Sequence, residues 1–216
     1  MNVDVRVADD PARAAAELLV EAAGHVALSG GSTPGRAYEL AARLRLDWSK
    51  AHVWFGDERA VAPSDERSNY RLARTTLFDA LSRPPESHRI KGELGAEEAA
   101  ALYEVELEGI TLDLALNGIG PDGHTASLFP GSPALDERER RAVAAEPGLE
   151  PFVPRVTLTP PVFAQARLLI YLVTGEDKAE AVRRAFAEEP TAEIPASLIR
   201  GVETIAFLDA AAAAHL

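Results

Sequence analysis

Short apolar runs alternate with helix-forming segments from one end of the chain to the other, and this order leaves few folds open. The apolar runs end at glycine or polar residues and are expected to be strands at 3–8, 25–30, 52–59, 112–117, 155–159, 168–175 and 204–209. The segments between them are rich in residues that favour helix, and they predict helices over 11–23, 34–44, 69–80, 96–107 and 176–187.

Continuous apolar strands separated by helices are typical of a mainly parallel sheet that is covered on both faces. We therefore predict an α/β fold with a doubly wound sheet and helices on both of its faces. A chain of 216 residues without an internal repeat or a linker-like stretch is expected to form one domain over 1–216. The least regular part, 130–154, is expected to be an excursion on the surface.

Composition narrows the class of protein further. No apolar run reaches about 18 residues, so no transmembrane helix or other membrane contact is expected. The acidic start MNVDVRVADD does not have the pattern of a signal peptide. The absence of cysteine excludes disulfides, a thiol nucleophile and cysteine-bound metal. We predict a cytoplasmic protein that is a monomer or a small homo-oligomer.

The net charge of −12 bears on the partner of the chain. A strongly acidic surface repels the phosphates of nucleic acid, so nucleic acid is not expected as a partner. A small phosphorylated substrate remains open, because it needs only a local cationic pocket.

Polar loops follow four of the predicted strands. In open parallel sheets, ligands bind beyond the carboxyl ends of the strands, where the following loops converge. Functional residues are therefore expected in the loops SGGSTPG (29–35), FGDERAV (55–61), NGIGPDGHTAS (117–127) and VTGEDK (173–178).

The first of these loops is predicted to bind an anion. It opens a helix, and Gly30 and Gly31 allow a ligand to approach the backbone N–H groups, to which Ser32 and Thr33 add hydroxyl donors. The loop matches neither a dinucleotide fingerprint nor a Walker loop. A plain Ser/Thr cap on a tight turn is the alternative.

The second loop places Asp57, Glu58 and Arg59 at the end of a strand. An acid in this position can act as a base or orient a sugar hydroxyl, although three charges in a row also suit a solvated turn. The polar stretch that follows contains Asn69 and Arg71 and is interpreted as a flap that faces the substrate, or as a long surface loop.

In the fourth loop, Lys178 lies in the first turn of a predicted helix, where the helix dipole disfavours a cation. A bound phosphate would relieve this conflict. The neighbouring Glu176 and Asp177 relieve it equally well as capping residues, so both readings stay open.

The third loop carries the most distinctive pattern, because the stretch 117–131 holds four glycines and two prolines together with a single Asp-Gly-His at 122–124. Imidazole is the usual general base near neutral pH, and the nearby carboxylate of Asp122 can orient it. We expect His124 to begin a helix that continues through TASLF, so that neighbouring amides face an oxyanion or a phosphate. A packed structural histidine is the alternative. No HxxxH or HxH spacing supports a metal site, and no GxSxG elbow supports a serine hydrolase.

In this order, the loops resemble those of the 6-phosphogluconolactonase family, within the larger group that includes the glucosamine-6-phosphate deaminases. The resemblance runs from 28 to 182 and is carried by LSGGSTPGRAYELA, VWFGDERAVAPSDERSNYRLARTTLF, DLALNGIGPDGHTASLFPG, PRVTLTPPVFAQA and TGEDKAEAV. Asn117 and Pro121 depart from the residues that members often carry, but neither change touches the Asp-Gly-His core.

The resemblance implies hydrolysis of 6-phospho-D-glucono-1,5-lactone to 6-phosphogluconate, without a cofactor. It implies that His124 is the base with Asp122 close by, and that Asp57 and Arg59 contact the substrate. Backbone amides of the turn around Gly123, or Arg59, are expected to stabilise the oxyanion.

For the phosphate, the resemblance implies contacts from the GGST loop, from Arg155 and from Lys178. The substrate is then held by its remote phosphate while the lactone ring faces the base.

Two other functions are open to a chain with loops of this kind. A sugar-phosphate isomerase or deaminase on the same fold is expected to carry a Glu five residues after the histidine, and this chain has Phe129 there. A non-catalytic sugar-phosphate sensor usually carries an added DNA-binding module, for which the chain has neither spare length nor a basic patch.

Overall fold

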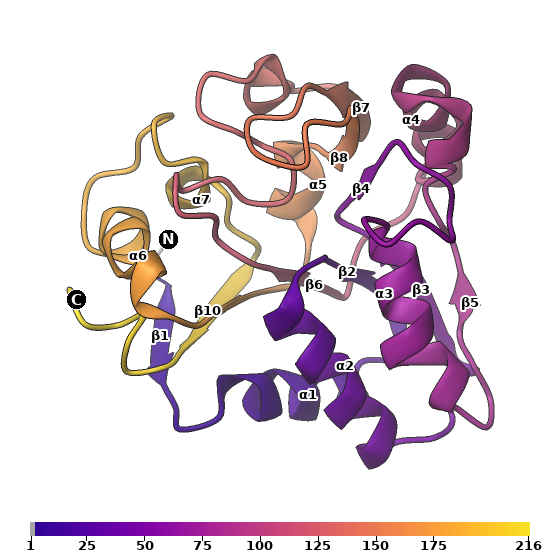
Figure 1. The fold of residues 1–216 in the computed structure, drawn as a ribbon, viewed down its shortest axis with the longest axis horizontal. Coiled ribbons are helices and arrows are strands. Elements are labelled where there is room, and N and C mark those ends of the chain that lie inside the picture. Colours follow the sequence, from indigo (N-terminus) through magenta and orange to yellow (C-terminus); the bar gives the residue numbers. More distant parts are fainter. Residues whose placement is uncertain (1–2) are drawn as a thin grey trace.

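The computed structural model describes residues 3–216, and a seven-stranded sheet runs through its middle (Figure 1). Every strand of this sheet is parallel to its neighbours, in the order β1–β10–β9–β6–β2–β3–β5. The strands span Asp4–Val7 (β1), Gly24–Leu28 (β2), Ala51–Phe55 (β3), Glu86–Ser87 (β5), Leu114–Asn117 (β6), Leu168–Val173 (β9) and Glu203–Leu208 (β10).

The helices fill most of the connections between these strands. They span Pro11–Glu21 (α1), Ser32–Leu44 (α2), Asn69–Thr76 (α3), Ala96–Glu106 (α4), Pro160–Gln165 (α5), Ala179–Phe186 (α6) and Pro195–Leu198 (α7). Short 3₁₀ turns lie at Phe78–Ala80, Gly92–Leu94, Pro133–Asp136 and Glu176–Lys178. Helices α1, α2 and α3 lie side by side (Figure 1). Within residues 3–216, no helix has the length and apolar character that a bilayer crossing requires.

The middle strands of the sheet are covered on both faces. All four residues of β6 are buried, as are Leu169 to Val173 of β9. Because neighbouring side chains of a strand point to opposite faces, burial of every residue means that both faces are packed. The predicted α/β fold with a mainly parallel, doubly covered sheet is confirmed.

A second, three-stranded antiparallel sheet was not predicted. It consists of β4 (Asp57–Arg59), β8 (Arg155–Leu158) and β7 (Ala142–Ala145), in the order β4–β8–β7. The stretch 52–59 was expected as one strand, but it divides at Gly56, whose N–H donates to the Leu28 carbonyl while its own carbonyl accepts from the Leu158 N–H. The chain therefore leaves the parallel sheet at this residue and pairs with β8 instead.

The four polar loops singled out in the sequence follow β2, β3, β6 and β9. These strands are consecutive neighbours in the sheet, in the order β9–β6–β2–β3. Since they are parallel, their carboxyl ends lie at the same edge, and the loops meet there.

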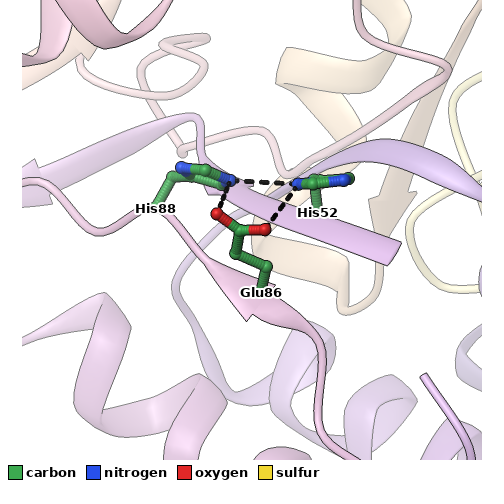
Figure 2. A group of neighbouring side chains, drawn as sticks. All are labelled: His52, Glu86 and His88. Carbon is green, nitrogen blue, oxygen red and sulfur yellow. Dashed lines mark hydrogen bonds and ion pairs between the residues drawn. The ribbon is translucent and has the colours of Figure 1, made fainter. Parts of the chain in front are cut away.

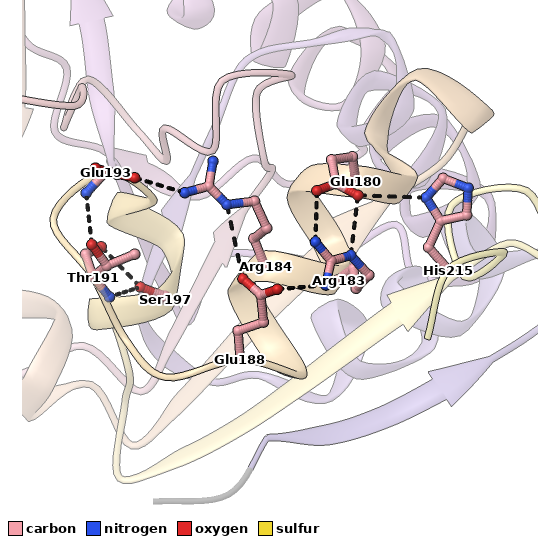
Figure 3. Close-up of polar contacts among 8 residues, drawn as sticks. All are labelled: Glu180, Arg183, Arg184, Glu188, Thr191, Glu193, Ser197 and His215. Atoms are coloured by element: carbon pink, nitrogen blue, oxygen red, sulfur yellow. Dashed lines mark hydrogen bonds and ion pairs between the residues drawn. The ribbon is translucent and has the colours of Figure 1, made fainter.

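Helix α6 is fastened to the segment that follows it (Figure 3). Arg184 contacts Glu193 at 2.8 Å, and the Ser197 hydroxyl accepts a 2.8 Å hydrogen bond from the Thr191 N–H. These contacts join α6, the loop 187–194 and α7 into one unit, which contains the buried side chain of Ile194.

The carboxylate of Glu58 joins β4 to the start of α3. One oxygen accepts from the N–H groups of Arg59 and Asn69, each at 2.8 Å, and the other accepts from the Ser68 hydroxyl at 2.9 Å and the Tyr70 N–H at 2.8 Å. Burial raises the pKa of Glu58, and these four hydrogen bonds oppose the shift. The polar flap is thereby anchored to the strand that carries Asp57.

We predict that Glu58→Gln lowers the free energy of unfolding by about 2–4 kcal/mol, because a side-chain NH2 replaces an oxygen that accepts two hydrogen bonds. Denaturant unfolding measures this loss. Glu66 lies exposed in the same flap, and Glu66→Gln is the control, with an expected change within about 0.5 kcal/mol. Equal losses in the two variants would show that Glu58 does not anchor the flap.

Candidate active site

A cavity of about 390 Å³ lies where the four loops meet. Nine of the residues predicted from the sequence line it: Gly30, Gly31, Ser32, Thr33, Asp57, Arg59, His124, Arg155 and Lys178. Residues more than 140 positions apart in the sequence thus share one wall, because parallel strands bring their carboxyl ends together.

His124 and Asp122 form a close pair beside this cavity. The Nδ1 atom of His124 lies 2.5 Å from Oδ1 of Asp122, which also accepts the His124 backbone N–H at 3.2 Å. Burial favours a higher pKa for Asp122, but the hydrogen bond and charge of His124 outweigh it, so the pKa lies below its ordinary value. A carboxylate at Nδ1 accepts the proton there, which leaves Nε2 of the imidazole as a free base.

The prediction of a helix that begins at His124 is wrong. The chain makes a tight turn instead, in which the Leu128 N–H donates to the Thr125 carbonyl and Ala126 has a φ of 50°. A positive φ interrupts a right-handed helix. The turn directs Ser127 back toward β4, where its hydroxyl donates to Oδ2 of Asp57 at 2.6 Å.

The glycines of the turn make room for protein groups. A Cβ on Gly120 would lie 2.0 Å from Nδ1 of His124, and one on Gly123 would lie 2.7 Å from Cδ1 of Ile194. Gly123 also has a φ of +82°, and its carbonyl accepts the Ala196 N–H at 2.9 Å. The Asp-Gly-His turn is therefore clamped between its own imidazole and the segment held by α6.

Asp57 is buried, and both of its oxygens are occupied. Oδ1 accepts from Nδ2 of Asn69 at 2.9 Å, and Oδ2 accepts from Ser127. The same Asn69 amide donates to the Asp57 carbonyl at 2.9 Å. These contacts connect β4, which carries Asp57, to the flap and to the turn after His124.

Three cations face the cavity. Arg155 is 3% exposed, and its Nε, like that of Arg59, is a buried donor without a partner among residues 3–216. Burial lowers the pKa of the Arg155 guanidinium, while the charge of Asp57 opposes this shift. Lys178 is largely covered and contacts Asp177 at 2.9 Å. Buried guanidinium donors that lack a partner favour an anion.

The amino end of α2 opens into the same cavity. Gly31 precedes the helix with a φ of 113° and no side chain caps the first N–H groups, so they are available to a ligand. The Thr33 hydroxyl lies 2.8 Å from that of Thr174, which connects this loop to the one that carries Lys178.

Four predicted residues do not line the cavity. Asp122 contacts His124, Gly123 lies in the same turn, and Asn69 donates a hydrogen bond to Asp57. Arg71 lies on α3, where its N–H donates to the Ser68 hydroxyl that caps the helix.

Sequence reasoning assigned no site role to Ser127, Phe129 or Thr174. The Phe129 ring lies 4.5 Å from the His124 ring and 5.8 Å from the Arg155 guanidinium carbon. Their positions within the motif stretches were the only sequence signal.

The parallel sheet, the His–Asp pair and the cationic cavity at the carboxyl edge define an α/β enzyme with a site for a small anionic substrate. A sequence model described as glucosamine-6-phosphate isomerases/6-phosphogluconolactonase matches residues 4–207. The chain belongs to this family.

Individual relatives agree with this assignment. A curated 6-phosphogluconolactonase of Nostoc sp. is 39% identical over 206 residues, which cover 88% of this chain and 84% of the relative. The structure of 6-phosphogluconolactonase from Trypanosoma cruzi superimposes with a TM-score of 0.88 at 29% identity, over 100% of this chain and 98% of that one. A monomeric glucosamine-6-phosphate deaminase shares the fold at a TM-score of 0.86 and 20% identity, over the whole of both chains.

We predict that Gly123→Ala destabilises the protein by about 2–4 kcal/mol, since the methyl group meets Ile194 and the backbone has a positive φ. Gly131→Ala is the matched control. Gly131 has a similar φ of +72° but open space around its Cβ position, so only the conformational cost of about 1 kcal/mol is expected. Denaturant unfolding that gives equal losses would contradict the clamp by Ile194.

Proposed function

We propose that this cavity hydrolyses 6-phospho-D-glucono-1,5-lactone to 6-phosphogluconate, the second step of the oxidative pentose phosphate pathway. The family and its lactonase relatives support the reaction. The observation that carries the mechanism is the placement of one imidazole, held at Nδ1 by Asp122, in the same cavity as three cations.

His124 is the general base in this proposal. Its Nε2 removes a proton from water while the water oxygen attacks C1 of the lactone, and the carbonyl oxygen becomes an oxyanion. Collapse of the tetrahedral intermediate breaks the bond from C1 to the ring oxygen, and the imidazolium returns its proton to that oxygen. Asp122 stabilises the imidazolium between the two steps, because it stays ionised at neutral pH. General base catalysis of this kind typically contributes about 10²–10⁴-fold.

The oxyanion needs a donor that is fixed before the reaction. Arg59 meets this requirement, because one of its terminal nitrogens is held by the Arg67 carbonyl while Nε has no partner among residues 3–216. A fixed donor at the oxyanion is worth about 3 kcal/mol in a low-dielectric site. Asp57 acts as an organiser, since both of its oxygens already accept hydrogen bonds.

The phosphate is assigned to Arg155, Lys178 and the amino end of α2. All three line the cavity, and two of them are covered cations. Binding of the remote phosphate then orients the lactone ring toward His124. Cytoplasmic location and the oligomeric state remain predictions.

The geometry around Phe129 argues against a deaminase. Its ring packs against His124, in the place where a carboxylate would be needed to relay a proton for opening of the sugar ring. An aromatic ring has no proton to give.

We predict that Lys178→Ala raises KM for the phosphorylated lactone by about 10–100-fold, the effect of losing a charged hydrogen bond, and leaves KM for unphosphorylated gluconolactone nearly unchanged. Steady-state kinetics on both lactones, corrected for spontaneous hydrolysis, measure the effect. Lys50 is exposed directly before β3, and Lys50→Ala is the control. Equal losses on both lactones would remove Lys178 from the phosphate site.

For the base, we predict that His124→Asn lowers kcat by about 10²-fold or more while the product still binds, because asparagine is polar and of similar size but not basic. The assay is coupled turnover of freshly generated lactone with chelator-treated protein. His215 lies far along the chain at the exposed C-terminus, and His215→Asn is expected to keep full activity. A folded His124→Asn enzyme that retains most of its kcat would make another group the base.

A further inference from the structure

A second cluster of titratable side chains lies at the opposite end of the sheet. His52 is at the start of β3, and the register pairs it with Glu86 on the edge strand β5. His88 follows two residues after Glu86 and so points to the same face. The lactone cavity lies beyond the other end of β3, so the cluster is separate from it.

The three side chains converge on one point (Figure 2). Nδ1 of His52 lies 3.2 Å from Nε2 of His88 and 3.4 Å from Oε2 of Glu86, and Oε1 of Glu86 lies 3.6 Å from Nε2 of His88. Ligands of a tetrahedral zinc ion, bound at about 2.0–2.1 Å, are separated by roughly 3.3 Å. The two imidazole nitrogens are separated by about one such edge, and each lies near a different oxygen of Glu86. With one ligand atom taken from each residue, the three atoms lie within 4.8 Å of one another.

The rings are held in place from behind. Trp54 stacks on His88 with ring centroids 4.0 Å apart and planes 6° apart. The Trp54 indole N–H donates to Nδ1 of His25 at 3.0 Å, so His25 uses that nitrogen as an acceptor and is not counted among the ligands. The backbone N–H of His25 is fixed in turn by Asp113 at 2.9 Å. The orientation of His88 is thus set by packing before any ion arrives.

The charge and the access of the cluster suit a cation. The carboxylate of Glu86 lies beside both imidazoles and supplies a negative charge to the group. The side chain of Glu86 is 65% exposed, which gives an ion a path from solvent. The net charge of −12 draws cations to the whole surface.

We propose that His52, Glu86 and His88 form a binding site for a divalent transition-metal ion, with zinc as the ion that fits the donor set. Two imidazole nitrogens and one carboxylate leave the fourth tetrahedral position to water. The ion joins the two-residue edge strand β5 to β3, and it takes no part in lactone hydrolysis.

The experiment is calorimetric titration of chelator-treated full-length protein with Zn²⁺. We expect the wild type to bind one Zn²⁺ ion tightly per protein molecule. In Glu86→Gln and in His52→Gln, we expect the Kd to rise by more than about 100-fold, because losing a direct ligand weakens metal affinity more than the 10–100-fold typical of losing an outer contact. His88→Phe keeps a ring to stack on Trp54 and is expected to lose the ion equally.

Two controls separate this site from other histidines. His215→Gln and His124→Asn are expected to bind Zn²⁺ as the wild type does. Zinc at about 100 times its Kd is expected to raise the Tm of the wild type by about 5–10 °C and to leave that of Glu86→Gln unchanged. Activity of the wild type on the lactone is expected to be the same with and without the ion, and the three ligand variants are expected to keep that activity.

Three results would overturn the proposal. The first is no tight binding by the wild type, and the second is tight binding that survives in Glu86→Gln and His52→Gln. The third is binding that disappears in His124→Asn, which would move the ion to the catalytic cavity. None of these results depends on whether the lactonase assignment holds, because binding is measured without substrate.

Discussion

The buried carboxylate of Asp57 connects the parts of the site that come from different regions of the chain. It accepts hydrogen bonds from Asn69 in the flap and from Ser127 in the turn after His124, and its own strand pairs with the strand of Arg155. A buried charge requires such partners, since an unpaired one would cost several kcal/mol. The hydrogen bonds that this one buried carboxylate requires therefore fix the loops of the site relative to one another.

The reacting end of the cavity depends on a second set of contacts. His124 is held from one side by Asp122 and packed from the other by Phe129, while Ile194 closes over Gly123. A chain with a net charge of −12 thus places three cations at the cavity, and its acids there accept hydrogen bonds from neighbouring groups. This arrangement lets an acidic protein bind an anionic substrate without a basic surface.

The fold and most of the cavity were predictable from the sequence. The pattern of apolar runs is local, and in an open parallel sheet the loops after the strands meet at the carboxyl edge. The motif of Asp122 and His124 and the glycine-rich loop before α2 follow from short spacings of this kind. The small antiparallel sheet and the turn after His124 depend on tertiary contacts of Gly56 and Ser127, which no local pattern encodes. The cluster of His52, Glu86 and His88 was missed because its members lie on two strands that pair only in the folded sheet.

We propose that the substrate lies with its phosphate at Arg155 and Lys178 and its reacting carbon at His124. A crystal structure with bound 6-phosphogluconate tests this polarity directly. We expect phosphate oxygens within hydrogen-bond distance of both cations and the product carboxylate within about 3.5 Å of Nε2 of His124. A product bound in the reverse direction, or with its carboxylate away from the imidazole, would contradict it.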